Sequence, residues 1–349
     1  MTNFEYEKLT EFDNHRTVLY LHDHAVGLKG FIALHRGGFH NPTFGATRFW
    51  NYVSEKDALR DALRLSRLMS YKSALAGLSY GGAKAVLIAP VADEKNRERI
   101  LRSYASQVNL LSGNFITGTD VGLDRRDLTL MKKVSKFFVG FRYNPEYYTA
   151  LGIYHSIKVC LSFLFGSSEV QGRSVSIQGL GKVGALLLAF LYKEGAHLII
   201  TDLQSDLIRK LKKKYHRVQV VPPQEIYKQK VDVFSPCALS GPLNIKSINK
   251  LNCKIIAGGA NNQLASEEIG ALLFRLGILY APDYVVNAGG LISVVDEFEY
   301  PQQDSDRIKK RLAIIPKTLK LILAESVRKK IATNLVANHL AEKRIKEFI

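Results

Sequence analysis

Short apolar runs alternate with helix-like spacing along the first third of the chain. The segment VLYLHDHAVGLKGFIALHRG has two apolar runs around DHAVG, which predicts a β-hairpin over residues 18–37. Ser54 begins SEKD, which resembles a capping box at the start of a helix. After it, apolar residues recur at helical spacing and predict a helix that ends near Lys72. AVLIAP at residues 85–90 predicts a short buried strand, and a second helix, capped by Asp93, is expected over residues 93–111.

From about residue 148 the pattern changes to a regular alternation of helices and strands. Apolar strands are expected at SVSIQ, HLIIT, VDVFSP and KIIAGG, with helices between them, and this alternation predicts a mostly parallel, doubly wound sheet. The chain is expected to be helical from Asp304 onward, with an interruption at Pro316. We therefore predict an α/β protein of two domains, one over residues 1–145 and the other over residues 146–310.

The composition is that of a folded protein, with 46% hydrophobic residues in 349. The net charge of +17 is unusual, but the basic residues are spread along the chain. Their densest cluster, IRKLKKKYHR, has the spacing of a solvated helix face, so nucleic-acid binding is the less favoured reading. We expect no membrane span, because no apolar run reaches about 18 residues. A polar N-terminus and three scattered cysteines predict a cytoplasmic protein with reduced thiols.

The segment GLGKVG follows a predicted strand and opens a predicted helix. Gly179 permits the tight turn, Gly181 lets the backbone approach a pyrophosphate, and Gly184 lets the helix pack on the strand. The first helical amides, expected at Lys182 and Val183, would face the phosphates. Asp202 closes the next strand, where a carboxylate would bind ribose hydroxyls and repel a 2′-phosphate, so NAD is predicted rather than NADP. The alternative is a glycine turn with a helix-capping aspartate.

Two lysines, Lys72 and Lys84, stand in an apolar, glycine-rich segment, LMSYKSALAGLSYGGAKAV. One ammonium group could bind a substrate carboxylate, and the other, with its pKa lowered by burial, could act as a general base. Gly81 and Gly82 would let a ligand approach the backbone. On these residues alone, surface lysines are the favoured interpretation.

Seven motifs in order resemble the amino-acid dehydrogenases that act on glutamate, leucine, phenylalanine and valine. They are GATRFW, LMSYKSALAGLSYGGAK, TGTDVG, GLGKVG, PCALSG, GGANNQL and APDYVVNAGG. The resemblance extends from about Leu19 to Glu297, and GLKGFIALH and SPCALSG are most similar to the leucine dehydrogenase branch. It implies a substrate and oligomerisation domain, an NAD-binding domain and an active site in the cleft between them. The terminal helices, residues 311–349, would then return to the first domain.

The resemblance also implies roles for individual residues. Lys72 would bind the substrate α-carboxylate, Lys84 would activate water, and Asp120 would move protons to and from the amino nitrogen. The implied reaction is the reversible NAD-dependent oxidative deamination of an apolar L-amino acid, of leucine or branched-chain type, to a 2-oxo acid and ammonia. The substrate pocket would include Phe44, Gly45, Met69, Gly118, Leu291 and Val294. The cofactor would also contact Thr149, Ala238, Asn261 and Asn262.

Several residues depart from the leucine branch and keep other readings open. Phe44, Ala46, Tyr80 and Tyr147 add bulk, which could narrow the pocket or line it for an aromatic ligand. The alternatives are therefore a dehydrogenase for phenylalanine, tryptophan or valine, and a catalytically silent NAD-binding regulatory protein. The cluster of His22, His24, His35 and His40 lacks ligand spacing, so no metal is predicted. A homodimer or a larger homo-oligomer is expected.

Overall fold

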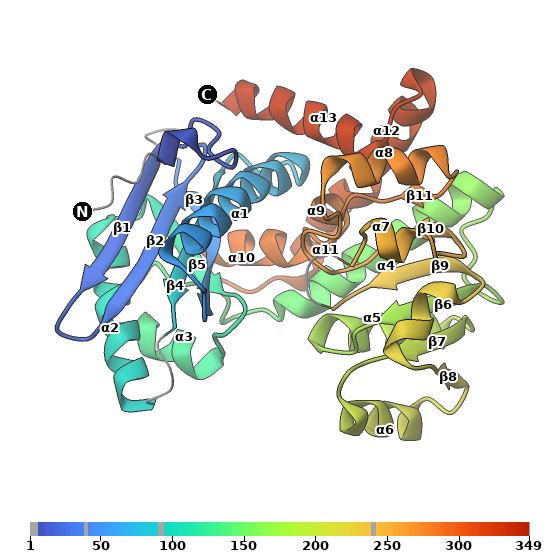
Figure 1. The fold of residues 1–349 in the computed structure, drawn as a ribbon, viewed down its shortest axis with the longest axis horizontal. Helices are drawn as coiled ribbons and strands as arrows, with labels where there is room; N and C mark the ends of the chain where they lie inside the picture. Colours follow the sequence, from blue (N-terminus) through green and yellow to red (C-terminus); the bar gives the residue numbers. More distant parts are fainter. Residues whose placement is uncertain (1–5, 38–40, 90–93, 239–241, 349) are drawn as a thin grey trace. The chain divides into compact units, whose positions relative to one another are not determined.

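The structure is a computed structural model that describes residues 6–37, 41–89, 94–238 and 242–348. The chain forms two compact units, shown in Figure 1. Unit 1 comprises Met1–Arg142, Glu297–Pro301 and Ala341–Ile349. Unit 2 comprises Tyr143–Asp296 and Gln302–Leu340.

Unit 1 is built on a five-stranded sheet with the order β1-β2-β4-β3-β5. Its strands are β1 (Thr17–Asp23), β2 (Leu28–Leu34), β3 (Thr43–Trp50), β4 (Gly81–Ile88) and β5 (Phe115–Thr119). β1, β2 and β4 are antiparallel neighbours, whereas β3 runs parallel to both β4 and β5. The predicted hairpin is confirmed as β1 and β2.

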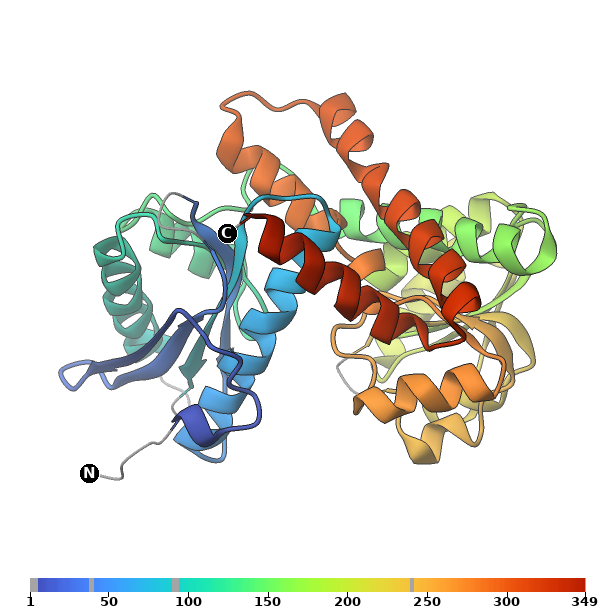
Figure 2. The same cartoon turned by 90° about the horizontal axis from the view of Figure 1, so that it is seen from above.

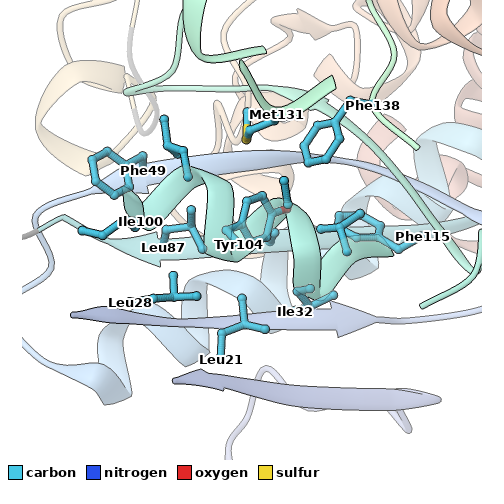
Figure 3. Close-up of a cluster of buried hydrophobic side chains, with 14 of the residues drawn as sticks. Leu21, Leu28, Ile32, Phe49, Leu87, Ile100, Tyr104, Phe115, Met131 and Phe138 are labelled. Carbon is cyan, nitrogen blue, oxygen red and sulfur yellow. The ribbon is translucent and has the colours of Figure 1, made fainter. Parts of the chain in front are cut away.

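Helices cover both faces of this sheet. The helices in the first 142 residues, the longest segment of unit 1, are η1 (Tyr6–Lys8), α1 (Glu55–Leu75), α2 (Glu94–Leu110) and α3 (Arg125–Lys132). α1 packs on one face through Ala58, Ala62 and Leu63, against Val86 of β4. On the other face, Ile100 and Tyr104 of α2 pack on the strands together with Met131 of α3, as Figure 3 shows.

Local capping residues explain where two of these helices begin. The Ser54 side chain accepts a hydrogen bond from the Asp57 amide and caps α1, as the sequence predicts. Asp124 caps α3 in a reciprocal capping box with Asp127. Asp93, the expected cap of α2, lies outside the described residues.

The strand expected over residues 85–90 begins earlier, at Gly81, so Lys84 lies within β4 and not in the loop before it. A Cβ on Gly81 would overlap the carbonyl of Arg36, and one on Gly82 would overlap the α1 backbone. These glycines therefore let the strand run directly beneath its neighbours. A prediction from strand propensity leaves these two glycines out of the strand, because glycine is unfavourable in strands unless neighbouring backbone leaves no room for a side chain.

Unit 2 contains a six-stranded parallel sheet with the order β11-β10-β9-β6-β7-β8. Its strands are β6 (Ser174–Gln178), β7 (His197–Thr201), β8 (Val218–Val220), β9 (Val231–Pro236), β10 (Cys253–Ile256) and β11 (Leu279–Tyr280). The order reverses between β6 and β9, which is the switch point of a doubly wound sheet. The predicted fold class is confirmed.

The other elements are mostly helices of unit 2. They are α4 (Pro145–Phe165), α5 (Lys182–Lys193), α6 (Ser205–Lys214), η2 (Pro223–Lys228), α7 (Ile245–Ile248), α8 (Glu267–Arg275), α9 (Asp283–Val286), α10 (Gly289–Glu299), α11 (Ser305–Leu312), α12 (Ile314–Lys329) and α13 (Thr333–Phe348). Pro316 falls in the first turn of α12, where a proline is tolerated, and a new helix begins there. α10 and α13 each begin in unit 2 and end in unit 1.

By length and composition alone, α4 could cross a membrane. Its mean hydropathy reaches 1.2 over 18 residues, and half of that window is buried within the protein. Core helices of soluble proteins have the same properties, so this single helix is weak evidence. The expectation of no membrane span stays a prediction.

The C-terminal helices are divided differently from the expected return of residues 311–349 to the first domain. α12, drawn in orange-red in Figure 2, packs on α4 and α9 and belongs to unit 2. Its buried face includes Leu319 and Ile322. Of this C-terminal region, only the segment from Ala341 onward is grouped with unit 1, and the last residues of α13 lie in it. An amphipathic pattern identifies a buried helix face but not which partner covers that face, so the sequence could not assign α12.

Candidate functional site

Two of the predicted site residues of unit 1, Lys84 and Gly118, belong to one row across its sheet, with Ala46 between them. Lys84 of β4 pairs with Ala46 of β3, and Ala46 pairs in turn with Gly118 of β5. Paired residues of neighbouring strands point to the same face, and here it is the face that α1 covers. Arg48 stands two residues further along β3, so strand alternation directs it to this face too.

Asp120 follows β5 and forms an ion pair with Lys84. Lys84 Nζ lies 2.6 Å from Asp120 Oδ2, and Arg48 Nε donates to the same oxygen over 3.0 Å. Only 6% of the Lys84 side chain and 15% of the Asp120 side chain are exposed. The two residues expected to carry the chemistry are thus in direct contact, although 36 positions separate them in the chain.

The pKa values of both groups are lowered, for different reasons. Burial lowers the pKa of Lys84, the adjacent Arg48 adds to this effect, and Asp120 opposes it. Burial by itself would raise the pKa of Asp120, but the positive charges of Lys84 and Arg48 outweigh burial and keep it below its ordinary value. A carboxylate therefore stands beside a lysine whose ammonium form is destabilised, an arrangement suited to proton transfer.

The predicted pocket residues Phe44 and Met69 lie close to this row. Phe44 of β3 pairs with Gly82 of β4, and a Cβ on Gly82 would come closer than 3.0 Å to the backbone of Met69. Phe44 is only 1% exposed. Its ring centroid lies 4.7 Å from that of Tyr80 and 5.3 Å from that of Phe298, so an aromatic cluster borders the Lys84 face.

The remaining predictions for unit 1 stay untested by these contacts. Lys72 lies half-buried in the last turn of α1. Gly45 pairs with Ala83, so alternation directs its missing side chain to the face opposite Lys84, and only its backbone could line the substrate pocket. Gly118 is half-buried in the Lys84 row.

In unit 2 the glycine-rich loop leaves β6 at the switch point of the sheet. Gly179 has a positive φ of 92°, and a Cβ there would lie 2.7 Å from the amide nitrogen of Ala238, which follows β9. A Cβ on Gly184 would overlap the carbonyl of Gly179. These contacts explain the first and third glycines, and they place the predicted residue Ala238 against the loop.

Gly181 differs, because a Cβ there would meet no atom within 4 Å. It is the N-cap of α5, and within the described part of the chain no side-chain capping hydrogen bond is made to the first turn of that helix. Free amides at a helix N-terminus beside open space can bind phosphate oxygens. The loop therefore fits the pyrophosphate of a dinucleotide, with the amides of Lys182 and Val183 at the first turn. The Lys182 ammonium is 3.0 Å from Glu146.

Asp202 follows β7 and is held by two backbone amides. Its Oδ2 accepts from Leu180 N over 2.6 Å, and its Oδ1 accepts from Gln204 N over 2.8 Å. The carboxylate thus binds the glycine-rich loop directly while remaining partly exposed. Each carboxylate oxygen has a second lone pair, so ribose hydroxyls can still donate to it.

The other predicted cofactor residues of unit 2 have varied surroundings. Thr149 Oγ1 donates to Pro145 O over 2.9 Å and accepts from Gly290 N over 3.1 Å, which joins α4 to the start of α10. Asn261 is exposed, and its Oδ1 accepts from Asn287 over 3.0 Å.

Asn262 and the two predicted substrate contacts of α10 are more enclosed. Asn262 is buried, has a positive φ of 53°, and donates its amide to Asp283. Leu291 is buried, Val294 is half-buried, and the two are three positions apart on one face of α10.

Sequence reasoning missed Arg48 and Asp61. Arg48 Nη1 lies 2.7 Å from Asp61 Oδ2, and Asp61 also accepts from the Tyr52 hydroxyl. Arg48 belongs to GATRFW, two positions after Ala46, so strand alternation could have placed it beside Lys84. Asp61 interrupts the apolar stripe of α1, and a carboxylate at such a position signals a buried partner.

No group of three or more His, Cys, Asp or Glu able to hold a metal occurs among the described residues. His35 instead contacts Ser70 and Asp13, and His15 contacts Ser66. His40 lies outside the described residues. The absence of a metal site stays a prediction for the whole chain.

Two family models match most of the chain. One, described as the Glu/Leu/Phe/Val dehydrogenase dimerisation domain, matches residues 16–136. The other, described as glutamate/leucine/phenylalanine/valine dehydrogenase, matches residues 199–348.

Individual relatives cover nearly the full length. The chain is 38% identical over 352 aligned residues to a leucine dehydrogenase of Bacillus cereus, covering 99% of this chain and 94% of that one. It is 37% identical to a phenylalanine dehydrogenase of Caldalkalibacillus thermarum, covering 99% and 95%. The crystal structure of L-tryptophan dehydrogenase from Nostoc punctiforme matches with a TM-score of 0.80 and 39% identity over 96% of both chains.

Proposed function

The chain belongs to the glutamate/leucine/phenylalanine/valine dehydrogenase family, and from that premise we propose that it oxidatively deaminates an apolar L-amino acid with NAD. Members of this family are amino-acid dehydrogenases that use NAD or NADP, so the chain is an oxidoreductase that acts on amino acids. The proposed reaction converts amino acid, NAD⁺ and water into 2-oxo acid, ammonium, NADH and a proton. The observation that carries the proposal is the buried contact between Lys84 and Asp120.

In the proposed mechanism these two side chains move the protons. The glycine-rich loop and Asp202 would hold NAD, which would supply the acceptor for the hydride of the substrate Cα. Asp120 accepts a proton from the amino nitrogen and later returns one to the departing ammonia. Lys84, as a neutral amine, takes a proton from the water that attacks the imino acid, and its ammonium form stabilises charge on the carbinolamine. Burial lowers the pKa of Lys84, which favours the neutral amine that this role requires.

We propose that Lys72 binds the substrate α-carboxylate and that the pocket accepts an apolar side chain. Phe44 and Met69 border the Lys84 face with apolar groups, which supports an uncharged substrate. Phe44, Tyr80 and Phe298 form an aromatic cluster there, and this observation favours a second candidate, an aromatic amino acid. Relatives named for leucine, phenylalanine and tryptophan have nearly equal identity, so similarity does not choose between these substrates.

NAD is proposed over NADP because Asp202 stands at the end of β7. Its negative charge would repel a 2′-phosphate, and the next two residues, Leu203 and Gln204, offer no cation to bind one.

We further propose that the chain forms a homodimer or larger homo-oligomer, which the match of residues 16–136 to a dimerisation domain supports. The free thiols of Cys160, Cys237 and Cys253 support a cytoplasmic location.

The test is NADH formation with a panel of aliphatic and aromatic L-amino acids, beside 2-oxo acids with ammonium in reverse. We expect turnover with an apolar amino acid, and loss of turnover in Lys84→Met with NADH binding retained. Lys29→Met is the matched control, because Lys29 forms an exposed ion pair with Glu55 elsewhere in unit 1. If NADH binds but no substrate reacts in either direction, the silent regulatory protein becomes the favoured function.

A further inference from the structure

Arg48 joins the proposed proton-transfer pair to a second carboxylate. Its Nε lies 3.0 Å from Asp120 Oδ2, and its Nη1 lies 2.7 Å from Asp61 Oδ2. Only 14% of the Arg48 side chain is exposed. One guanidinium therefore bridges two carboxylates at the Lys84 face, and the proton transfers described above assign this bridge no role.

Asp61 is itself held firmly on the far side of Arg48. It stands on α1 with 10% of its side chain exposed, and its Oδ1 lies 2.7 Å from Arg64 Nη2. The Tyr52 hydroxyl donates to its Oδ2. Since Asp61 is anchored by two further donors, it fixes the position of the guanidinium, and Arg48 in turn presents Nε to Asp120.

Lys84 and Arg48 bind the same oxygen of Asp120 but differ in chemistry. A lysine can lose its proton, whereas an arginine guanidinium stays charged throughout the accessible pH range. The proposed reaction requires Lys84 to be a neutral amine while it takes a proton from water. During that interval Lys84 contributes no positive charge, and a buried carboxylate without a cation would take up a proton instead.

We propose that Arg48 is a positioning residue, the permanent cation that keeps Asp120 a carboxylate, oriented toward Lys84, while Lys84 is a neutral amine. The inference rests on the proposed function of Lys84 and Asp120. The charged and titratable groups that face this pair are Arg48 from β3, Asp61 from α1, and Tyr52 and Arg64 through Asp61. Without Arg48, deprotonation of Lys84 would leave Asp120 as an uncompensated buried charge, so Lys84 would hold its proton to higher pH.

The first test is the pH dependence of kcat/KM for oxidative deamination in wild type, Arg48→Met and Arg48→Lys. We expect the limb that reports Lys84 deprotonation to move upward by about one to two pH units in Arg48→Met, since a nearby unit charge is removed. Arg48→Lys restores the charge and should recover most of the shift. A residue with only a structural role would lower stability or activity without moving this limb.

A second readout does not depend on turnover. The pH dependence of Lys84 acetylation by acetic anhydride, followed by mass spectrometry of the Lys84 peptide, measures the same proton. The matched control is Arg60→Met, because Arg60 lies on α1 next to Asp61 but pairs with Glu11 through an exposed side chain. We expect Arg60→Met to leave both the limb and the acetylation profile in place.

The outcomes separate the two proposals. If wild-type protein oxidises no amino acid, the proposed function fails, yet the acetylation profile still tests the Arg48–Asp120–Lys84 linkage. If wild type turns over and Arg48→Met, folded by thermal melting, keeps both profiles unshifted, the role of Arg48 is refuted. Equal shifts in Arg48→Met and Arg48→Lys would also refute it, because charge would not be the cause.

Discussion

The amide of Gly82 on β4 donates a hydrogen bond of 2.9 Å to the hydroxyl of Ser70 on α1. The two backbones are so close that a Cβ on Gly82 would come within 3.0 Å of Ser70 N. Gly82 precedes Lys84 by two positions on β4, and the backbone of Met69, next to Ser70 on α1, also lies against Gly82. The register of the proposed catalytic strand beneath its helix therefore depends on the absence of a side chain.

Gly82→Ala is expected to separate β4 from α1 and to displace Lys84. Overpacking of this kind costs about 1–3 kcal/mol of the free energy of unfolding. A displacement of about 1 Å in a catalytic group can lower turnover by about 100-fold. Urea unfolding and kcat/KM with the preferred amino acid measure the two effects. Unchanged stability and activity would show that α1 and β4 are not in such close contact.

Gly181→Ala is expected to weaken NAD binding without destabilising the fold. The Gly181 φ of −60° suits alanine, and the added methyl group would meet no atom within 4 Å. The methyl group would instead occupy the space through which a pyrophosphate approaches the backbone. We expect the Kd for NADH to rise at least about tenfold, equivalent to about 1.4 kcal/mol, in a fluorescence titration.

Gly184→Ala, in the first turn of α5, is the control in the same glycine-rich motif. A Cβ there would overlap the Gly179 carbonyl, so this variant should lose stability by thermal melting. If Gly181→Ala binds NADH as tightly as wild type does, the loop is not the phosphate site.

His15 and His35 are expected to make the protein sensitive to acid. Burial lowers the pKa of His15 to about 4 and also lowers that of His35. A histidine with a depressed pKa binds more protons when unfolded, so its stability contribution is complete above about pH 6.5 and is lost as the pH falls toward 4. The pKa of Asp13 is lowered to about 2, first by its hydrogen bond to His35. Asp13 therefore also contributes stability that is lost on acidification, at lower pH than for the histidines.

Urea unfolding of wild type and His15→Gln between pH 7 and pH 4.5 tests this expectation. The variant should show a smaller loss of unfolding free energy over this range, corresponding to up to about one proton fewer taken up on unfolding. His22→Gln, which removes an imidazole from an exposed position on β1, is the control for the substitution itself. An unaltered slope in His15→Gln would mean that His15 does not titrate on unfolding.

Phe44→Leu is expected to shift the substrate preference toward larger side chains. Phe44 fills the space on the Lys84 face next to Tyr80 and Phe298, and leucine there would leave room for a ring. We expect the ratio of kcat/KM for phenylalanine over leucine to rise by about 10-fold or more. The loss of stability should be smaller than the about 3–5 kcal/mol typical of truncation to alanine.

Phe115→Leu is the control, because Phe115 is a fully buried ring on the opposite face of the same sheet. It should change stability without changing the substrate ratio. Equal ratios in Phe44→Leu and wild type would indicate that Phe44 does not line the substrate pocket.

Much of the fold follows from local pattern alone. The structure confirms the hairpin of β1 and β2. It also confirms that β6, the glycine-rich turn and α5 follow one another. Alternation, glycine turns and helical spacing are local properties, so the sequence is enough to predict them. The unit to which α12 belongs does not follow from local pattern, because α12 packs on α4, which is distant in sequence. The sequence pattern predicts a start of β4 at Ala85, four residues after the observed start at Gly81. Glycine has a low strand propensity, and only the close approach of neighbouring backbone to β4 explains why glycines stand there.

For the candidate site, the sequence by itself determined which functional groups are available. They are the amine of Lys84 after two glycines, the carboxylate of Asp120 after a strand, and a glycine-rich turn before Asp202. These assignments depend on residue type and short spacing. Only the tertiary structure decided that Lys84 and Asp120 touch and that Arg48 and Asp61 stand behind them. The physical reason is that strand register and the packing of α1 bring together residues tens of positions apart, and each pairing depends on the whole sheet.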